Sequence, residues 1–172
     1  MDFSEHNRVS LLPTQAMTLK LARPPIQMTH AKNWKIDKVN PVHDLVVCLS
    51  GGGRYQIDGE EILLTGGDAM LIPAYSRFRG AYMGKGENYV GAAQHFSLDL
   101  FGRGDIINLM HLRSHVKLSN WEMLEPLVRH FRATPSRMMA TIAQHHQFMV
   151  ILLAFLEDAF LGWRETAKGP SE

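Results

Sequence analysis

The stretch from His43 to Pro73 reads HDLVVCLSGGGRYQIDGEEILLTGGDAMLIP, and it decides the fold class. Short apolar segments alternate in it with turn residues at 51–53, Asp58-Gly59 and 66–68. An Asp-Gly pair between two alternating segments is a strong hairpin signal, because a type I′ turn needs positive φ at both central residues. Closely spaced strands with glycine at the corners are typical of a small β-barrel or sandwich. We therefore expect a mainly β protein.

Composition narrows the class of protein further. The 172 residues suffice for one domain with a substantial core. Contents of 45% hydrophobic and 20% charged residues are ordinary for a globular chain. A formal net charge of +1 gives no basic signal for nucleic acid. The single cysteine, Cys48, cannot form an internal disulfide, which fits a reducing cytoplasm. No apolar run approaches the ~20 residues of a membrane span, and we expect a cytoplasmic protein.

Further strands are expected on both sides of this stretch. They fall at 17–22, 34–38, 78–83 and 87–98, which brings the total between residues 17 and 98 to roughly eight. Side chains alternate between the two faces of a strand. The last of these strands therefore carries on one face Tyr89, Gly91, Ala93 and His95.

Two helices are expected after residue 100. Ser119 and Glu122 have the spacing of a capping box, so the first helix begins there. Pro135 suits the first position of a second helix, which we expect from Ser136 to about Leu161. That helix is apolar on two sides, and one apolar stripe is enough to pack it on a sheet. The second stripe indicates a partner surface, unless the helix is enclosed within the domain.

Glycine-punctuated strands of this kind resemble the first half of the cupins, many of which are metalloenzymes. The resemblance implies a His-x-His pair, a Glu and a further His as metal ligands. No His-x-His occurs in this sequence, and His43 stands alone beside Asp44. A catalytic divalent site needs three imidazole or carboxylate ligands. We therefore expect no metal and no other cofactor, although a barrel could bring His43 and His95 together.

The order of motifs is similar to that in the N-terminal domain of AraC-family transcription regulators. The motifs are Leu49, Gly51 and Gly53, then the segment from Gly67 to Pro73, then His95-Phe96, followed by the helix pair. The resemblance implies a cupin- or jelly-roll-like barrel that is followed by two antiparallel α-helices. It also implies that the barrel binds a small-molecule effector and that the second helix forms a homodimer.

The same resemblance implies an order of segments along the chain. An N-terminal arm is expected at 1–15, the effector-binding barrel at 16–100 and a helical dimerisation region at 101–162. Residues 163–172 are then a linker toward a DNA-binding domain with two helix-turn-helix motifs. DNA is expected to be bound only by that further domain, which this chain lacks.

Candidate site residues follow from the same reading. Lys38 matches the family position where a basic side chain reaches the ligand, whereas Gly91 and Ala93 stand where the family has a His and an aromatic. Small residues there imply an effector that is bulkier than the founding member's sugar or has a different shape. The ligand-binding candidates are Lys38, Trp34, His95, Tyr89, Tyr82 and Arg79. Each residue also has an alternative role that involves no ligand. Lys38 and Arg79 could be solvated, His95 could form hydrogen bonds within the barrel, and the aromatic residues could belong to the core.

The candidate residues for dimerisation lie on the second helix. They are Met139, Ile142, His146, Met149, Val150 and Leu153. Two other functions stay open from the sequence. One is a stand-alone cupin enzyme, such as an isomerase or dioxygenase, and the other is a stand-alone small-molecule-binding protein.

Overall fold

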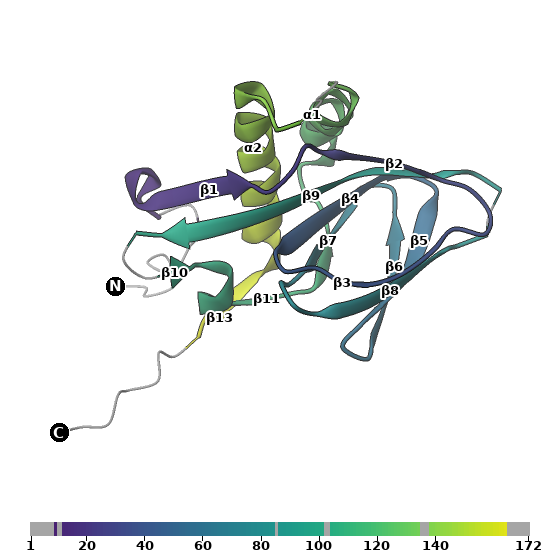
Figure 1. Ribbon diagram of the computed structural model, residues 1–172, viewed down its shortest axis with the longest axis horizontal. Coiled ribbons are helices and arrows are strands. Elements are labelled where there is room, and N and C mark those ends of the chain that lie inside the picture. The colour runs from purple at the N-terminus through teal and green to yellow at the C-terminus, as the bar shows by residue number, and fades with distance from the viewer. Residues whose placement is uncertain (1–8, 10–11, 85, 102–103, 135–137, 165–172) are drawn as a thin grey trace.

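The computed structural model describes residues 9, 12–84, 86–101, 104–134 and 138–164. Antiparallel sheets and two α-helices make up this part of the chain (Figure 1). The fold is mainly β with two C-terminal helices, as the sequence predicts. Most of the expected arm and most of the expected linker lie outside the described residues.

The larger of the two main sheets has the strand order β1-β9-β4-β7-β12, and β2 and β10 also pair with β9. Its strands are β1 (Met17–Leu21), β2 (Ile26–His30), β4 (His43–Ser50), β7 (Asp68–Ile72), β9 (Tyr89–Leu100), β10 (Gly104–Asp105) and β12 (His115–Lys117). The smaller sheet, in the order β3-β8-β5-β6, contains β3 (Lys35–Val39), β5 (Gly52–Ile57), β6 (Glu60–Thr65) and β8 (Arg77–Tyr82). The remaining elements are the paired strands β11 (Met110–Leu112) and β13 (Phe160–Trp163) and the short 3₁₀ helices η3 (Thr14–Ala16) and η4 (Ile107–Leu109).

The hairpin that the sequence places at Asp58-Gly59 is confirmed. Both residues have positive φ, 48° at Asp58 and 83° at Gly59, as a type I′ turn requires. Ile57 pairs with Glu60 directly across the turn, so β5 and β6 keep one register along their whole length. Local turn chemistry therefore sets the geometry of the smaller sheet at this end.

Strand β4 lies inside the larger sheet and is buried on both faces. Because side chains alternate along a strand, Leu45 and Val47 face the helices, while Val46 and Cys48 face the smaller sheet. Two hydrophobic cores result, one beneath the helices and one between the two main sheets. The core between the sheets surrounds the candidate site.

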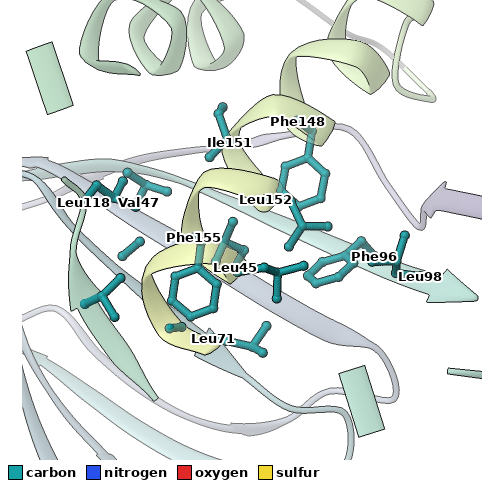
Figure 2. Close-up of a cluster of buried hydrophobic side chains, with 14 of the residues drawn as sticks. Leu45, Val47, Leu71, Phe96, Leu98, Leu118, Phe148, Ile151, Leu152 and Phe155 are labelled. Carbon is teal, nitrogen blue, oxygen red and sulfur yellow. The ribbon is translucent and has the colours of Figure 1, made fainter. Parts of the chain in front are cut away.

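Two helices, α1 (Trp121–Ala133) and α2 (Ile142–Ala159), cover the face of the larger sheet that points away from the smaller one (Figure 1). Figure 1 shows α1 nearly end-on and α2 from the side, so the helices cross one another on the sheet. Phe148 and Phe155 project from α2 toward Leu45 of β4 (Figure 2). Phe148 also lies against Phe96, with ring centroids 5.2 Å apart.

The start of the second helix differs from the prediction. Helix α2 begins at Ile142 and not at Ser136, because Thr141 forms the capping box there. The Thr141 hydroxyl accepts from the backbone of Gln144 at 3.1 Å, and the Gln144 side chain accepts from the backbone of Thr141 at 2.9 Å. Residues 135–137 lie outside the described residues.

Two other helix boundaries also differ from expectation. Ser119 does not cap α1, because its backbone N–H and its hydroxyl both donate to the carboxylate of Asp158, at 2.8 and 2.9 Å. Helix α2 ends at Ala159, and the residues up to Trp163 form β13, which pairs with β11. Neither α1 nor α2, the helices in the described part of the chain, is long and apolar enough to cross a membrane.

Candidate functional site

A cavity of about 140 Å³ lies between the two main sheets, and we call it the inner cavity. Its walls come from the inward faces of β2, β3, β4, β5, β7, β8 and β9, with Trp34 before β3 and Asn40 after it. An engineered apolar cavity of ~150 Å³ in another protein holds benzene, so this one has room for a small molecule. The apolar lining consists of Ile26, Met28, Ile36, Val46, Ile72, Phe78 and Ala93.

One side of the inner cavity is an aromatic wall. The rings of His30 and Trp34 stack with their centroids 4.2 Å apart, and Tyr55 meets Trp34 edge to face at 6.0 Å. The hydroxyls of Tyr55 and Tyr89 share a hydrogen bond of 2.7 Å. Burial raises the pKa of both phenols, and burial lowers the pKa of His30. The wall is therefore uncharged at neutral pH.

The other side of the cavity carries a cluster of three buried polar side chains, Asn40, Asp44 and His95, which we call the polar cluster. Pairing of β4 with β9 places Asp44 directly opposite His95. The His95 Nε2 atom lies 3.4 Å from Asp44 Oδ2 and 3.4 Å from Asn40 Nδ2. Only 7% of the Asp44 side chain is exposed, so solvent reaches this carboxylate poorly.

The polar cluster does not satisfy its own hydrogen-bonding groups. An imidazole nitrogen carries either a proton or a lone pair, so His95 Nε2 can serve Asp44 or Asn40 but not both. The buried atoms Asn40 Oδ1 and Asp44 Oδ1 have no hydrogen-bond partner in the described structure. Leaving a buried acceptor unpaired costs about 1–3 kcal/mol, and such unpaired buried groups are rare in folded proteins. A bound donor would supply the missing partner.

The structure brings three of the predicted ligand-binding residues to this cavity. Trp34, Lys38 and His95 all line it. Lys38 shares the inward face of β3 with Ile36, but its side chain is exposed and therefore lies at the mouth. Tyr89 lies behind the wall, where it supports Trp34 at a ring distance of 5.7 Å.

Two predicted ligand-binding residues lie elsewhere. The Tyr82 hydroxyl donates to the carbonyl of Glu87 at 2.7 Å, and Tyr82 lines a separate hollow beside Gly51 and Gly52. Arg79 lies on the outward face of β8, where its Nε is 3.3 Å from Asp37 Oδ2. Side chains alternate between the two faces of β8, and Phe78 points inward. The next residue, Arg79, therefore points outward and away from the cavity.

His43 does not meet His95, which corrects the expectation that the barrel could join them. His43 points to the opposite side of β4, where its Nε2 contacts Asp105 Oδ2 at 2.5 Å and its Nδ1 accepts from the backbone of Ala74 at 2.9 Å. His43 is the first residue of β4 and is only 2% exposed. The next residue, Asp44, points into the cavity instead.

Sequence reasoning missed several residues of the site. In the sequence, Asp44 stands out only as the neighbour of His43, and Asn40 carries no signal of its own. Strand β2, which brings Met28 and His30 to the cavity, was not expected because two prolines precede it. The alternation of apolar and polar residues in Ile26-Gln27-Met28-Thr29-His30 was the signal that could have identified this strand.

A metal ion, which the cupin resemblance implies, does not fit the residues present. Within the described part of the chain, no group of three or more His, Cys, Asp or Glu side chains is placed to hold one. The inner cavity offers only His95 and Asp44 as strong ligands at its polar side, with His30 stacked on the opposite wall. Fewer than three convergent ligands are not sufficient for a typical divalent site.

A larger hollow of about 510 Å³ lies on the outward face of the smaller sheet. Four of its charged side chains are paired, Asp37 with Arg79 at 3.3 Å and Arg54 with Glu61 at 3.6 Å. Asp37 also pairs with the neighbouring Arg77 at 2.8 Å. These pairs are exposed and already satisfied. These paired groups would gain less from a bound ligand than the unpaired acceptors of the inner cavity would.

No family model matches the sequence, and no curated protein matches it. Solved structures that resemble part of the chain are cupin-domain proteins. The cupin_2 domain of an XRE-family transcriptional regulator from Enterobacter cloacae is 18% identical, covers 47% of this chain and 97% of its own, and has a TM-score of 0.38. KdgF from Halomonas sp. is 16% identical, and the match covers 55% of this chain and 89% of KdgF, with a TM-score of 0.37. A cupin superfamily protein from Desulfitobacterium hafniense is 15% identical, and the match covers 54% of this chain and 85% of that protein, with a TM-score of 0.38. At such values no activity, ligand or partner is carried over.

Proposed function

We propose that this chain is the effector-sensing and dimerisation domain of an AraC-type transcriptional regulator and that a small molecule binds in its inner cavity. The observation that carries the proposal is the polar cluster, in which buried acceptors of Asn40 and Asp44 have no partner among the described residues. A pocket of this kind, mostly apolar with a few convergent polar groups, is typical of small-molecule sites. The AraC resemblance of the sequence supplies the regulatory part of the proposal.

Strand β2 connects the cavity to the helices. Met28 and His30 line the cavity, while Thr29 points outward, where its hydroxyl accepts from Arg132 of α1 at 3.1 Å. The Arg132 guanidinium also donates to the carbonyls of Met28 and Gly91, at 3.0 and 2.9 Å, and Gln27 donates to the carbonyl of Arg132. A ligand that displaces β2 would therefore move α1. Such coupling requires the ligand to bind one arrangement more tightly than the other.

The outward face of α2 supports self-association. Five of the predicted dimerisation residues lie on this face, which we call the α2 stripe: Ile142, His146, Met149, Val150 and Leu153. Ile142 is 80% exposed and Val150 is 47% exposed, whereas Met149 and Leu153 are half-buried. Met139, the sixth, precedes the helix and is exposed. Exposed apolar stripes mark interaction sites, and we assign this one to a second copy of the chain.

Native mass spectrometry tests the binding part of the proposal. Protein purified from its natural host should retain a small molecule at one copy per chain. Ala93→Leu, which fills the cavity, should lose that molecule, whereas Gly162→Ala, far from the cavity, should retain it. A molecule that stays bound to the Ala93→Leu protein would place the binding site elsewhere.

Sedimentation velocity tests the dimer. The unaltered chain should sediment as a dimer, and Val150→Glu should make it monomeric, because a buried unpaired carboxylate opposes association. Val39→Glu is the matched control. Val39 is also a valine and is 49% exposed, against 47% for Val150, but it lies on β3. A monomer at every concentration, or equal effects of the two variants, would contradict the assignment.

The DNA-binding part of the proposal is tested in the gene. Two helix-turn-helix patterns are expected in the sequence that follows Glu172. A stop codon at that point would favour a stand-alone small-molecule-binding protein.

The Asp44–His95 pair favours a second candidate, an enzyme that transfers a proton on a bound small molecule. A His held by a carboxylate in a cavity is a common general base. A metal-dependent enzyme is tested by elemental analysis of protein purified without added metal or chelator. Stoichiometric Fe, Mn, Ni or Zn would favour the enzyme over the regulator. Turnover of the molecule found by mass spectrometry, lost in His95→Gln, would favour the metal-free form.

A further inference from the structure

We propose that the inner cavity selects a small organic amine, bound as its ammonium ion with the charged group against Asp44 and Asn40. This inference rests on the proposed function, namely that the cavity binds a small molecule. It adds the chemical class of that molecule. The class follows from the hydrogen-bonding groups, the charges, the aromatic wall and the volume of the cavity.

The free hydrogen-bonding groups of the polar cluster require donors. Asp44 Oδ1 and Asn40 Oδ1 are both buried acceptors without a partner in the described structure. An ammonium group presents three donors and no acceptor, which is enough donors for both oxygens. A hydroxyl presents one donor and would leave one of the two oxygens unpaired. A carboxylate presents none.

The charges around the cavity favour a cation at the same end. Asp44 is the one acidic side chain among the described residues that line the cavity, and it is buried. The one lysine among them, Lys38, is exposed at the mouth and makes no ion pair with Asp44. Asp44 has an ion-pair contact with His95 at 3.4 Å through Oδ2, and its Oδ1 is left without a partner in the described structure. A cation bound at Oδ1 would gain from this buried carboxylate, since ion attraction is strong where solvent is excluded. An anion at this end would meet repulsion from the same carboxylate.

The other nitrogen bases that line the cavity outside the polar cluster are Lys38 and His30. The Lys38 side chain is exposed, so water and salt screen its charge. His30 adds no charge at neutral pH, because burial keeps its pKa low.

The aromatic wall and the volume limit the size of the amine. Trp34 and Tyr55 also line the cavity, and their rings offer an apolar surface to the carbon chain of the ligand. A volume of about 140 Å³ is close to that of a cavity that holds benzene. The ligand should thus contain about six non-hydrogen atoms, within a margin of a few.

Three probes of equal length test this inference: n-butylammonium, n-butanol and butyrate. Each is titrated at neutral pH and millimolar concentration into isotopically labelled protein, and the NMR signals of the Trp34 indole N–H and the Asn40 side-chain amide are followed. We expect n-butylammonium to shift both signals along a saturable curve. n-Butanol should bind roughly tenfold more weakly or worse, and butyrate should not bind.

Asp44→Asn tests the assigned residue, because it keeps the shape and removes the charge. Affinity for n-butylammonium should fall roughly ten- to a hundredfold, while that for n-butanol should stay the same. Asp37→Asn is the control, the same substitution on the outward face of β3. If Asp44→Asn does not fold, Asn40→Leu should still weaken n-butylammonium binding several-fold by removing one acceptor.

The outcomes separate the two proposals. Preference for n-butanol or butyrate, or an amine affinity unchanged in Asp44→Asn, overturns the amine inference and leaves the cavity as a small-molecule site. Failure of n-butylammonium to shift the Trp34 and Asn40 signals also overturns the amine inference. Whether the cavity holds a small molecule at all is decided separately, by native mass spectrometry of the unaltered and Ala93→Leu proteins.

Discussion

Phe148 is one of the buried side chains that attach α2 to the larger sheet. It is 1% exposed, and its ring centroid lies 5.2 Å from that of Phe96 and 6.0 Å from that of Phe131. Phe→Ala substitutions in a core cost about 3–5 kcal/mol, through lost transfer energy and the remaining cavity. Two aromatic contacts put Phe148→Ala in the upper half of that range, at about 4–5 kcal/mol.

Urea denaturation followed by circular dichroism measures this loss. With an m value of about 2 kcal/mol/M, a loss of 4 kcal/mol lowers the transition midpoint by about 2 M. A loss of this size is a large share of the ~5–15 kcal/mol that stabilises a domain. Phe148→Leu provides a milder step if the alanine variant does not fold, and its midpoint should lie between the other two.

Phe101→Ala is the matched control for Phe148→Ala. Phe101 is 86% exposed at the end of β9, so its truncation should change the free energy of unfolding by less than about 0.5 kcal/mol. A loss below about 1 kcal/mol for Phe148→Ala, or equal losses for the two variants, would refute the packing of this face of α2 on the sheet. The α2 stripe would then no longer be the outward face of the helix.

Three further predictions concern the barrel itself. Gly91→Ala should destabilise the fold by about 3 kcal/mol or more, because the new Cβ would lie 2.2 Å from the Val47 carbonyl oxygen. Gly162→Ala is the control in the same urea assay, and it should be tolerated because its new Cβ would have no atom within 4 Å. Burial raises the pKa of the Cys48 thiol to about 12, so a thiol-specific reagent should react at mildly alkaline pH only after unfolding. Burial also raises the pKa of Tyr55 and Tyr89, so the folded state holds their protons more tightly than the unfolded state does, and stability should decline as the pH rises above ~10 in urea titrations.

Each of these predictions has a contradicting result. Equal stability of Gly91→Ala and Gly162→Ala would mean that β4 and β9 can separate at this point. Rapid labelling of Cys48 in the folded protein would show that the inner core opens readily. Phenolate absorbance from Tyr55 and Tyr89 near pH 10 without unfolding would contradict their burial between the sheets.

Turn chemistry and alternation made much of the barrel predictable. Asp58-Gly59 sets its own hairpin because the positive φ values are a local property of that dipeptide. The alternation that placed Ala93 and His95 on one face of β9 is confirmed, since both line the inner cavity. Helix α2 was predicted as an element, but its start was not, because the cap at Thr141 gave a weaker signal than Pro135.

The sequence by itself determined the Asp58-Gly59 hairpin and the presence of both helices, because these depend on neighbouring residues. It did not determine which side of an element faces inward when both sides are apolar, as on β4 and α2. Only the pairing of β4 with β9 turned Asp44 toward His95 and His43 away from it. Only the packing of Phe148 on the sheet left Val150 exposed. Such choices depend on contacts between residues far apart in the chain, and the tertiary structure alone brings those residues together.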